Sequence, residues 1–77
     1  MKIYSIDNCP YCDRARRLLN QESIKFDEIK ADQLSQEELN EVLKKSGMRT
    51  FPQIFDGDRL IGGYTELRAA YEKGELS

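Results

Sequence analysis

Two cysteines, Cys9 and Cys12, are the residues of this 77-residue chain whose type and spacing point most directly to chemistry. They are the only cysteines in the sequence. A Cys-x-x-Cys pair where a strand meets a helix is typical of a thiol–disulfide redox site. Two other interpretations compete with this one, namely half of a metal site and a pair of ordinary structural cysteines.

The expected helix start gives the two thiols different roles. We expect Cys9 at the N-cap, where the free backbone N–H groups of Tyr11 and Cys12 and the positive end of the helix dipole favour thiolate over thiol. Thiols in such motifs have pKa values lowered to about 3.5–7.5. Pro10 fits the first turn because its missing N–H is harmless there. The sequence therefore predicts that Cys9 is the nucleophile, and that the better shielded Cys12 is the resolving thiol.

A second candidate element is the tripeptide Thr50-Phe51-Pro52, directly before the β-rich run 53–55. Proline cannot donate to a sheet ladder, so Pro52 must lie at the start of a strand or on an edge. If the Phe51–Pro52 bond is cis, the Phe51 N–H and C=O turn outward and can pair with an extended peptide beside Cys9. The competing interpretation is a proline that only ends a loop.

The third candidate element is Gly62-Gly63-Tyr64-Thr65-Glu66. Two glycines let the backbone approach a ligand closely, and the N-terminus of the following helix can hold an anion. A carboxylate could therefore dock on the N–H groups of Thr65 and Glu66. Taken alone, a Gly-Gly pair is also common in ordinary turns.

The elements that must position these groups follow from hydrophobic periodicity and from cap and turn residues. We expect strands at 2–6 and 24–29, a helix at 13–20, a helix that opens with the Ser35–Glu38 capping box and ends before Gly47, a hairpin at 53–61, and a last helix capped by Thr65 and stopped at Gly74. Asp56-Gly57 predicts a type I′ turn with positive φ at both residues. The order β-α-β-α-β-β-α predicts an α/β, thioredoxin-like fold with a mixed four-stranded sheet flanked by helices.

Composition narrows the possible functions. Residues 1–77 suffice for one domain, and a net charge of −2 argues against a general nucleic-acid or membrane-surface role. No stretch approaches the roughly 20 apolar residues that span a bilayer, and the N-terminus enters a strand without the apolar region of a signal peptide. We therefore expect a cytoplasmic protein, in which a lone cysteine pair is more often catalytic than structural.

The absence of histidine excludes Cys–His hydrolase chemistry and most zinc catalysis. Two cysteines supply only half of a tetrahedral zinc site. We therefore expect no metal site within one chain, and a metal centre shared between two chains stays open.

Together, the three motifs resemble those of the glutaredoxin family. The run 9–12 is similar to its dithiol active site, the run 49–55 to its cis-proline segment and the run 61–67 to its glycine-pair loop, and the likeness extends from residue 2 to about residue 73. The resemblance implies glutathione-dependent reduction of protein disulfides and of protein–glutathione mixed disulfides. Glutathione would be the reducing cosubstrate, with no tightly bound cofactor.

The resemblance also assigns roles to the residues around the cysteines. Phe51 would bind the cysteinyl backbone of glutathione, and Thr65 with Glu66 would hold its γ-glutamyl carboxylate. Arg49 matches a position near the glycine carboxylate, although a solvated loop charge is an equal alternative. The expected glutathione-binding set is Tyr11, Arg49, Thr50, Phe51, Pro52, Gly63, Tyr64, Thr65 and Glu66. Expected protein partners carry disulfides or glutathionylated cysteines, with ribonucleotide reductase as one candidate, and we expect a monomer.

One departure from the family matters for the nucleophile. The family commonly has lysine or arginine three residues before the first cysteine, where this chain has Ile6. Stabilisation of the Cys9 thiolate would then depend more on the helix terminus, and glutathione would bind more weakly or depend on Arg49. Phe51 also stands where valine is more usual, which makes the substrate wall bulkier.

Three alternative functions remain at this stage. The first is a similar enzyme recharged by thioredoxin reductase, which the Gly-Gly-Tyr-Thr-Glu loop speaks against because that loop favours glutathione. The second is a carrier of an iron–sulfur cluster bridging two chains through Cys9 and glutathione thiols, which Pro10 disfavours. The third is a plain binding module, in which Cys9 would be dispensable.

Overall fold

The computed structural model describes residues 1–76, which form four strands, three α-helices and one short 3₁₀ helix. In chain order they are β1 (Lys2–Ser5), α1 (Pro10–Gln21), β2 (Asp27–Lys30), η1 (Ala31–Gln33), α2 (Gln36–Ser46), β3 (Gln53–Asp56), β4 (Arg59–Gly62) and α3 (Tyr64–Glu72). The predicted order β-α-β-α-β-β-α is confirmed, and η1 is an addition to it.

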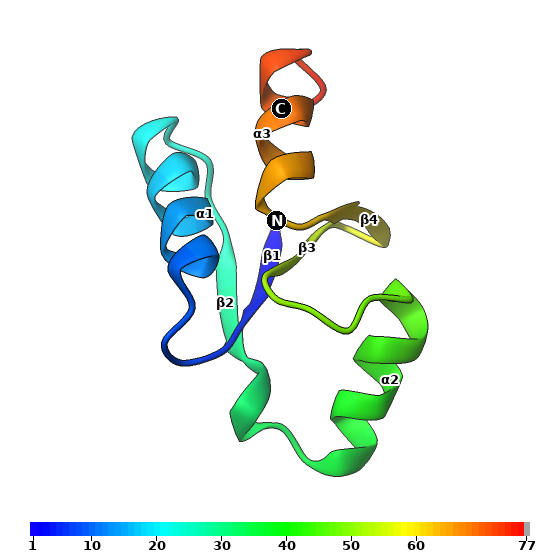
Figure 1. Ribbon diagram of the computed structural model, residues 1–77. Helices are drawn as coiled ribbons and strands as arrows, with labels where there is room; N and C mark the ends of the chain where they lie inside the picture. Colours follow the sequence, from blue (N-terminus) through cyan, green and yellow to red (C-terminus); the bar gives the residue numbers. More distant parts are fainter. Residues whose placement is uncertain (77) are drawn as a thin grey trace.

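The four strands form one mixed sheet in the order β2-β1-β3-β4 (Figure 1). β1 pairs in parallel with β2, and β3 pairs antiparallel with both β1 and β4. The predicted mixed four-stranded sheet is therefore confirmed. The carboxyl end of β1 leads directly into the loop that carries Cys9, so the centre of the sheet positions the cysteine pair.

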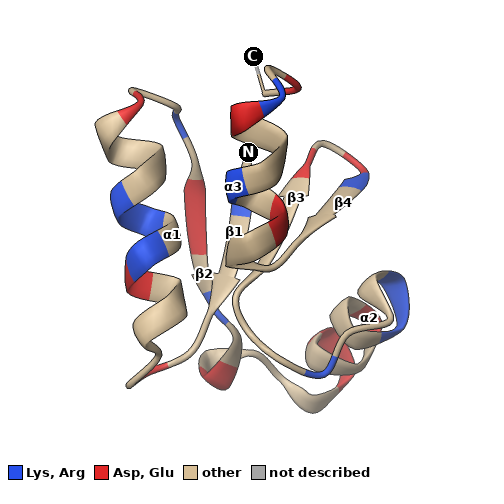
Figure 2. Cartoon of the chain, turned by 45° about the horizontal axis from the view of Figure 1, so that its top comes forward, with Lys and Arg blue, Asp and Glu red and all other residues tan. Residues whose placement is uncertain are grey.

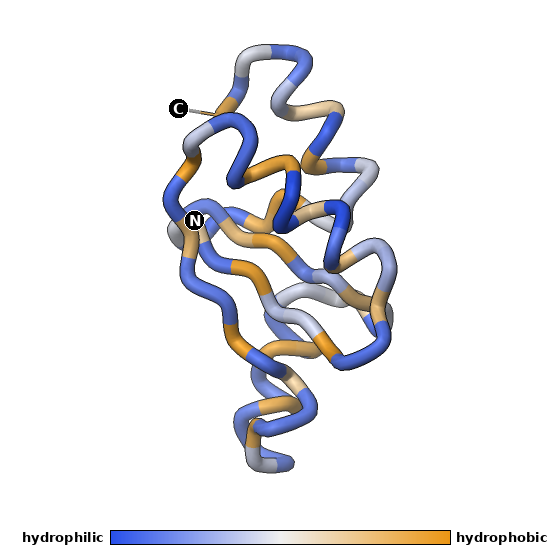
Figure 3. The backbone as a smooth tube through the Cα atoms, turned by 90° about the vertical axis from the view of Figure 1, so that its left-hand side faces the viewer, coloured by the Kyte–Doolittle hydropathy of each residue, from blue (hydrophilic) through white to orange (hydrophobic). Residues whose placement is uncertain are grey.

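The helices cover the two faces of the sheet, with α1 and α3 on one face and α2 on the other. On the first face, Ile3 and Ile54 from the strands pack with Ala15 and Leu19 of α1 and Leu67 of α3, all fully buried. Burying each large aliphatic side chain contributes about 1.5–3 kcal/mol. Figure 3 shows short hydrophobic stretches alternating with hydrophilic ones along the chain.

The caps of α1 and α2 form as predicted. Cys9 is the N-cap of α1 and Pro10 its first residue. In α2, the Ser35 hydroxyl accepts from the Glu38 N–H at 3.2 Å, and the Glu38 carboxylate accepts from the Ser35 N–H at 3.1 Å. Gly47 ends α2 in the left-handed region with φ of 69°. None of the helices in the described part of the chain is long and apolar enough to cross a membrane.

The second strand begins later than predicted. The expected strand 24–29 is observed as Asp27–Lys30, because its parallel pairing with β1 starts at Asp27, opposite Lys2. Ile24 instead closes the end of α1, where its N–H donates to the Leu19 carbonyl at 2.8 Å. The first strand likewise ends at Ser5 rather than at residue 6, opposite Lys30.

The last helix starts earlier than predicted, and the hairpin turn is of another type. Gly63, not Thr65, is the N-cap of α3, because the Leu67 N–H already bonds to the Gly63 carbonyl at 2.9 Å. In the hairpin, β3 ends at Asp56 and β4 begins at Arg59, so the two loop residues are Gly57, with a φ of 63°, and Asp58; neither Asp56 nor Asp58 has a positive φ. The expected type I′ turn is therefore wrong, and positive φ at the first of the two loop residues matches type II′.

Candidate active site

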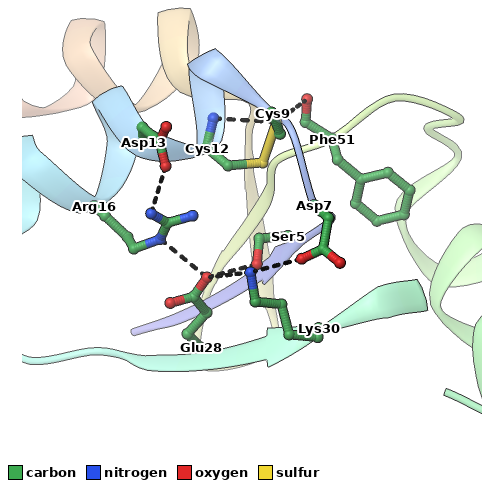
Figure 4. Close-up of polar contacts among 9 residues, drawn as sticks. All are labelled: Ser5, Asp7, Cys9, Cys12, Asp13, Arg16, Glu28, Lys30 and Phe51. Carbon is green, nitrogen blue, oxygen red and sulfur yellow. Dashed lines mark hydrogen bonds and ion pairs between the residues drawn. A yellow bond between two sulfur atoms is a disulfide. The ribbon is translucent and has the colours of Figure 1, made fainter. Parts of the chain in front are cut away.

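The cysteine pair lies at the N-terminus of α1 and forms a disulfide (Figure 4). The Cα atoms of Cys9 and Cys12 are 5.2 Å apart. Cys12 is fully buried, whereas Cys9 is only partly buried. The Cys12 N–H donates to the Cys9 sulfur at 3.2 Å. The accessible sulfur is therefore the one that receives a backbone N–H at a helix start, which favours its thiolate once the disulfide is reduced.

A cis peptide bond joins Phe51 and Pro52, as expected. The Phe51 carbonyl oxygen lies 3.7 Å from the Cys9 sulfur. Figure 4 shows this carbonyl directed at Cys9 and the Phe51 ring directed away from the disulfide. Within residues 1–76, the Phe51 N–H donates to no backbone group outside the regular elements. The backbone beside Cys9 can therefore still pair with an extended ligand.

A groove of about 410 Å³ runs from this segment to the start of α3. It brings together all but one of the expected glutathione-binding residues, and its lining residues are Tyr11, Met48, Thr50, Phe51, Pro52, Gly63, Tyr64, Thr65 and Glu66. Met48 is the lining residue that the motifs do not predict. Only its position just before the cis-proline segment could have drawn attention to it.

Two aromatic rings form a wall of the groove. The ring centroids of Tyr11 and Tyr64 are 6.1 Å apart, with an interplanar angle of 33°. The Arg14 guanidinium lies 5.1 Å from the Tyr11 ring centroid, and Tyr11 is 54% exposed. A cation over an aromatic face is attracted by the ring quadrupole. Tyr11 thus lies exposed along the groove, in contact with Arg14.

The glycine pair shapes the other end of the groove. Gly62 has a φ of 126°, and a Cβ atom there would lie 2.8 Å from Cβ and Cγ of Glu66. The Glu66 carboxylate accepts from the Gly63 N–H at 2.7 Å. The first turn of α3 leaves the N–H groups of Thr65 and Glu66 without acceptors inside the helix. These groups match the predicted anion site, although the N-cap of the helix lies two residues earlier than expected.

A buried glutamine fixes the backbone before the cis-proline. The Gln53 side chain is fully buried, and its Nε2 donates to the carbonyl oxygens of Met48 and Thr50 at 3.1 Å each. Its Oε1 is the buried side-chain oxygen without a partner in the described part of the chain. Because both carbonyls belong to the segment that lines the groove, Gln53 fixes that segment from its buried side.

A charged network ties the start of α1 to β2 (Figure 4). Glu28 Oε2 accepts from the Ser5 hydroxyl at 2.6 Å and from Arg16 Nε at 2.9 Å, and it lies 3.8 Å from Lys30 Nζ. Arg16 also pairs with Asp13 at 2.6 Å. Burial raises the pKa of Glu28, but the Ser5 hydroxyl and the two cations outweigh it and hold that pKa below its ordinary value.

Two residues singled out from the sequence lie differently from the rest. Arg49 is exposed and does not line the groove; it lines a separate hollow next to α2. Its expected contact with the glycine carboxylate stays a prediction. Ile6 is partly buried, and the residue after it, Asp7, pairs with Lys30 at 3.4 Å. Within residues 1–76, no group of three or more His, Cys, Asp or Glu side chains is arranged to hold a metal ion.

The fold and the site together define a class: a thioredoxin-fold protein with a dithiol–disulfide centre at a helix N-terminus, beside a cis-proline. A family model described as Glutaredoxin matches residues 1–61. Over 75 residues, the chain is 39% identical to glutaredoxin 1 of Rickettsia prowazekii (strain Madrid E), covering 96% of this chain and 79% of that protein. Over 76 residues, it is 38% identical to glutaredoxin 3 of Escherichia coli (strain K12), covering 99% and 90%.

Solved structures give the same result. A buckwheat glutaredoxin–glutathione complex matches with a TM-score of 0.85 at 30% identity, covering 97% of this chain and 70% of that one. Glutaredoxin from Brucella melitensis matches with a TM-score of 0.79 at 40% identity, covering 96% and 79%. This chain belongs to the glutaredoxin family, whose members are generally thiol–disulfide oxidoreductases that use glutathione.

Proposed function

We propose that this protein reduces protein disulfides and protein–glutathione mixed disulfides, with glutathione as the reductant. One observation supports this most strongly. The partly buried Cys9 sulfur accepts the Cys12 N–H, and it lies 3.7 Å from the Phe51 carbonyl, on the segment that lines the groove. A nucleophile stabilised as thiolate thus stands beside a backbone surface suited to a peptide-like substrate.

In the two-thiol reaction, the Cys9 thiolate attacks one sulfur of a target disulfide. The Cys9–target mixed disulfide forms, and the other target sulfur leaves as a thiolate that takes a proton from water. Cys12, after losing its proton, then attacks the Cys9 sulfur and releases the second target thiol. Two electrons have passed to the target, and the enzyme holds the Cys9–Cys12 disulfide. Burial of Cys12 suits it to this second, internal attack.

Glutathione closes the cycle. One glutathione thiolate attacks the Cys9–Cys12 disulfide and leaves a glutathionyl group on Cys9, and a second glutathione removes it as glutathione disulfide. We place the γ-glutamyl carboxylate on the N–H groups of Thr65 and Glu66. The Glu66 carboxylate offers an acceptor for the neighbouring α-ammonium group, and the cysteinyl backbone would pair with Phe51. The groove of about 410 Å³ has room for such a tripeptide along its length.

The setting that we propose is the cytoplasm, where glutathione keeps thiols reduced. A single domain acting as a monomer fits this role, because the site is formed by one chain. The protein partners would carry disulfides or glutathionylated cysteines, and ribonucleotide reductase remains a candidate target.

The test is a coupled assay that follows the oxidation of glutathione with two kinds of substrate. Cys9→Ser should abolish activity toward both. Cys12→Ser should retain reduction of a small glutathione mixed disulfide, which needs one thiol, and lose reduction of a protein disulfide, which needs two.

Activity that survives Cys9→Ser would overturn the mechanism. Equal loss of both reactions in Cys12→Ser, with the fold intact by circular dichroism, would contradict the division of roles between the two cysteines.

A further inference from the structure

Gln53 is the first residue of β3, and its fully buried side chain reaches back to the segment that lines the groove. Its Nε2 donates to the carbonyl oxygens of Met48 and Thr50, at 3.1 Å each, so both N–H bonds of the amide are used. β3 lies inside the sheet, between β1 and β4. One side chain thus joins a central strand to the residues that a substrate would contact.

Few other contacts hold this segment, residues 48–52. In the described part of the chain, no backbone hydrogen bond outside the regular helices and strands involves it. Its first N–H donates to the Ser46 hydroxyl at 3.0 Å. Arg49, blue in Figure 2, is the one charged residue between α2 and β3, and it takes part in none of the ion pairs of the described residues. The position of the segment therefore depends largely on Gln53.

The glutamine amide is buried at a cost in free energy. Its Oε1 has no hydrogen-bond partner in the described part of the chain. A buried acceptor without a partner is unfavourable, because no protein donor replaces the water that it bonds in the unfolded state. Methionine has a similar length and lacks this oxygen, but it also lacks the two N–H donors. The donors are therefore what distinguishes glutamine from an apolar side chain at this position.

The bond to Thr50 has a direct consequence for the neighbouring donor. The Thr50 carbonyl and the Phe51 N–H belong to one planar peptide unit, and this unit is trans, since the cis bond is the one that follows, between Phe51 and Pro52. In a trans peptide the C=O and the N–H point in opposite directions. Because the Thr50 carbonyl points to the buried Gln53 amide, the Phe51 N–H points away from the protein interior.

We infer that Gln53 is a positioning residue for substrate binding: its amide turns the Phe51 N–H outward, where this N–H can donate to the cysteinyl carbonyl of glutathione or of a glutathione mixed disulfide. Gln53 is fully buried and acts through Phe51. The inference rests on the proposed function, because it names the residue that orients a donor of that same site.

The experiment compares Gln53→Met and Gln53→Glu with wild type, using a small glutathione mixed disulfide. Methionine removes both donors, and glutamic acid keeps the shape but has a single donor, and that only when protonated. Both variants should raise the KM for the mixed disulfide by a factor of about 3 to 10, the size expected when one hydrogen bond to the substrate is lost. The kcat should change less, because the N–H bond to the Cys9 sulfur lies outside the segment.

A second readout separates positioning from general damage to the fold. Iodoacetamide is too small to need the Phe51 N–H, so the pH profile of Cys9 alkylation should be the same in wild type and both variants. Ile54→Val is the matched control, because it removes one methyl group from the next residue of β3, which is buried in the core against α1 and α3. It should lower stability and leave the KM unchanged.

If a variant does not fold, wild type decides by hydrogen exchange measured with NMR. The side-chain amide protons of Gln53 should exchange far more slowly than those of the exposed Gln21. S-methylglutathione, which cannot form a disulfide, should slow the exchange of the Phe51 N–H when it binds. Fast exchange at Gln53, or no change at Phe51 on binding, would overturn the inference.

The kinetic results discriminate further. An unchanged KM in Gln53→Met, with the fold intact by circular dichroism, would overturn the positioning role and leave the proposed function standing. The same holds if Ile54→Val raises the KM as much as Gln53→Met, since Gln53 would then serve stability alone. Failure of wild type to reduce the mixed disulfide would instead refute the proposed function.

Discussion

At the scale of single residues, the two sulfurs differ in what surrounds them. Cys9 is partly buried and receives an N–H, whereas Cys12 is fully buried behind it. Periodicity could predict this difference, because Cys12 lies on the same buried face of α1 as Ala15 and Leu19, while Cys9 lies at the helix start. What spacing could not predict is the distance of 3.7 Å between the Phe51 carbonyl oxygen and the Cys9 sulfur, since that contact depends on a segment 42 residues away in sequence.

A first prediction concerns Ile6, which stands where the family commonly has a cation. Ile6→Lys should lower the KM for glutathione, because a positive charge three residues before Cys9 favours both the thiolate and an incoming carboxylate. The carboxylate of the next residue, Asp7, which pairs with Lys30, would also attract the new lysine and so reduce the gain. The measurement is a glutathione titration at a fixed concentration of mixed disulfide.

Ile6→Gln is the control for that substitution, since it makes the side chain long and polar without adding charge. The same decrease in KM with glutamine would attribute the effect to shape. An unchanged KM with lysine would show that this position has no influence on glutathione in this protein.

At the scale of elements, caps and periodicity predicted α1 and α2 well, because their signals are local: a proline in the first turn, a capping box and Gly47 at the end. The start of β2 was predicted wrongly because it depends on the register of its pairing with β1, which is a long-range property. The start of α3 was missed because its N-cap is Gly63, which has no side chain that could mark it as a cap, while the Glu66 carboxylate accepts from the Gly63 N–H. Met48 joined the groove through the fold and not through a motif.

A second prediction tests the glycine pair as an element rather than as a flexible turn. Gly62→Ala should destabilise the protein by about 1–3 kcal/mol through backbone strain alone, with a further cost from contact with Glu66. The start of α3 must shift to relieve that contact, so the KM for glutathione should rise as well. Chemical denaturation and the coupled assay measure the two effects.

Gly47→Ala is the matched variant for this comparison. Gly47 also has a positive φ, of 69°, but a Cβ atom there meets nothing within 4 Å. It should therefore cost only the left-handed backbone penalty of about 1–2 kcal/mol and leave the KM for glutathione unchanged. If the two alanine variants lost equal stability and equal affinity, close packing between Gly62 and Glu66 would have no role.

At the scale of the whole molecule, the sheet and α1 are joined by polar as well as apolar contacts. The apolar cluster of Ile3, Leu19, Ile54 and Leu67 could be anticipated from periodicity. The Glu28–Arg16 pair could not, because charged residues on separate elements carry no periodic signal. Glu28 therefore gives the fold a pH dependence that the sequence alone did not indicate.

A third prediction follows from the direction of that pKa shift. Because the pKa of Glu28 is held below its ordinary value of 4.5 in the folded protein, its stabilising contribution is present above about pH 4.5 and is lost as the pH falls through the lower, folded value. Glu28→Gln should therefore be less stable than wild type near neutral pH, and the difference in the free energy of unfolding should shrink in acid.

Denaturant unfolding at a series of pH values measures this difference. Glu41→Gln serves as the comparison, since Glu41 is exposed and has no ion pair in the described part of the chain. A Glu28→Gln curve that runs parallel to that of wild type down to acid pH would show that the network adds no pH-dependent stability.

The central claim, that Cys9 is the attacking sulfur and that glutathione reaches it, is tested most directly by mass spectrometry of the Cys12→Ser protein. After reaction with glutathione disulfide, we predict one glutathionyl group per chain, located on Cys9 by peptide mapping and removed by added glutathione. In the Cys9→Ser protein, the buried Cys12 should acquire the group far more slowly. Equal or faster labelling of Cys12, or no stable glutathionyl group on Cys9, would contradict the account.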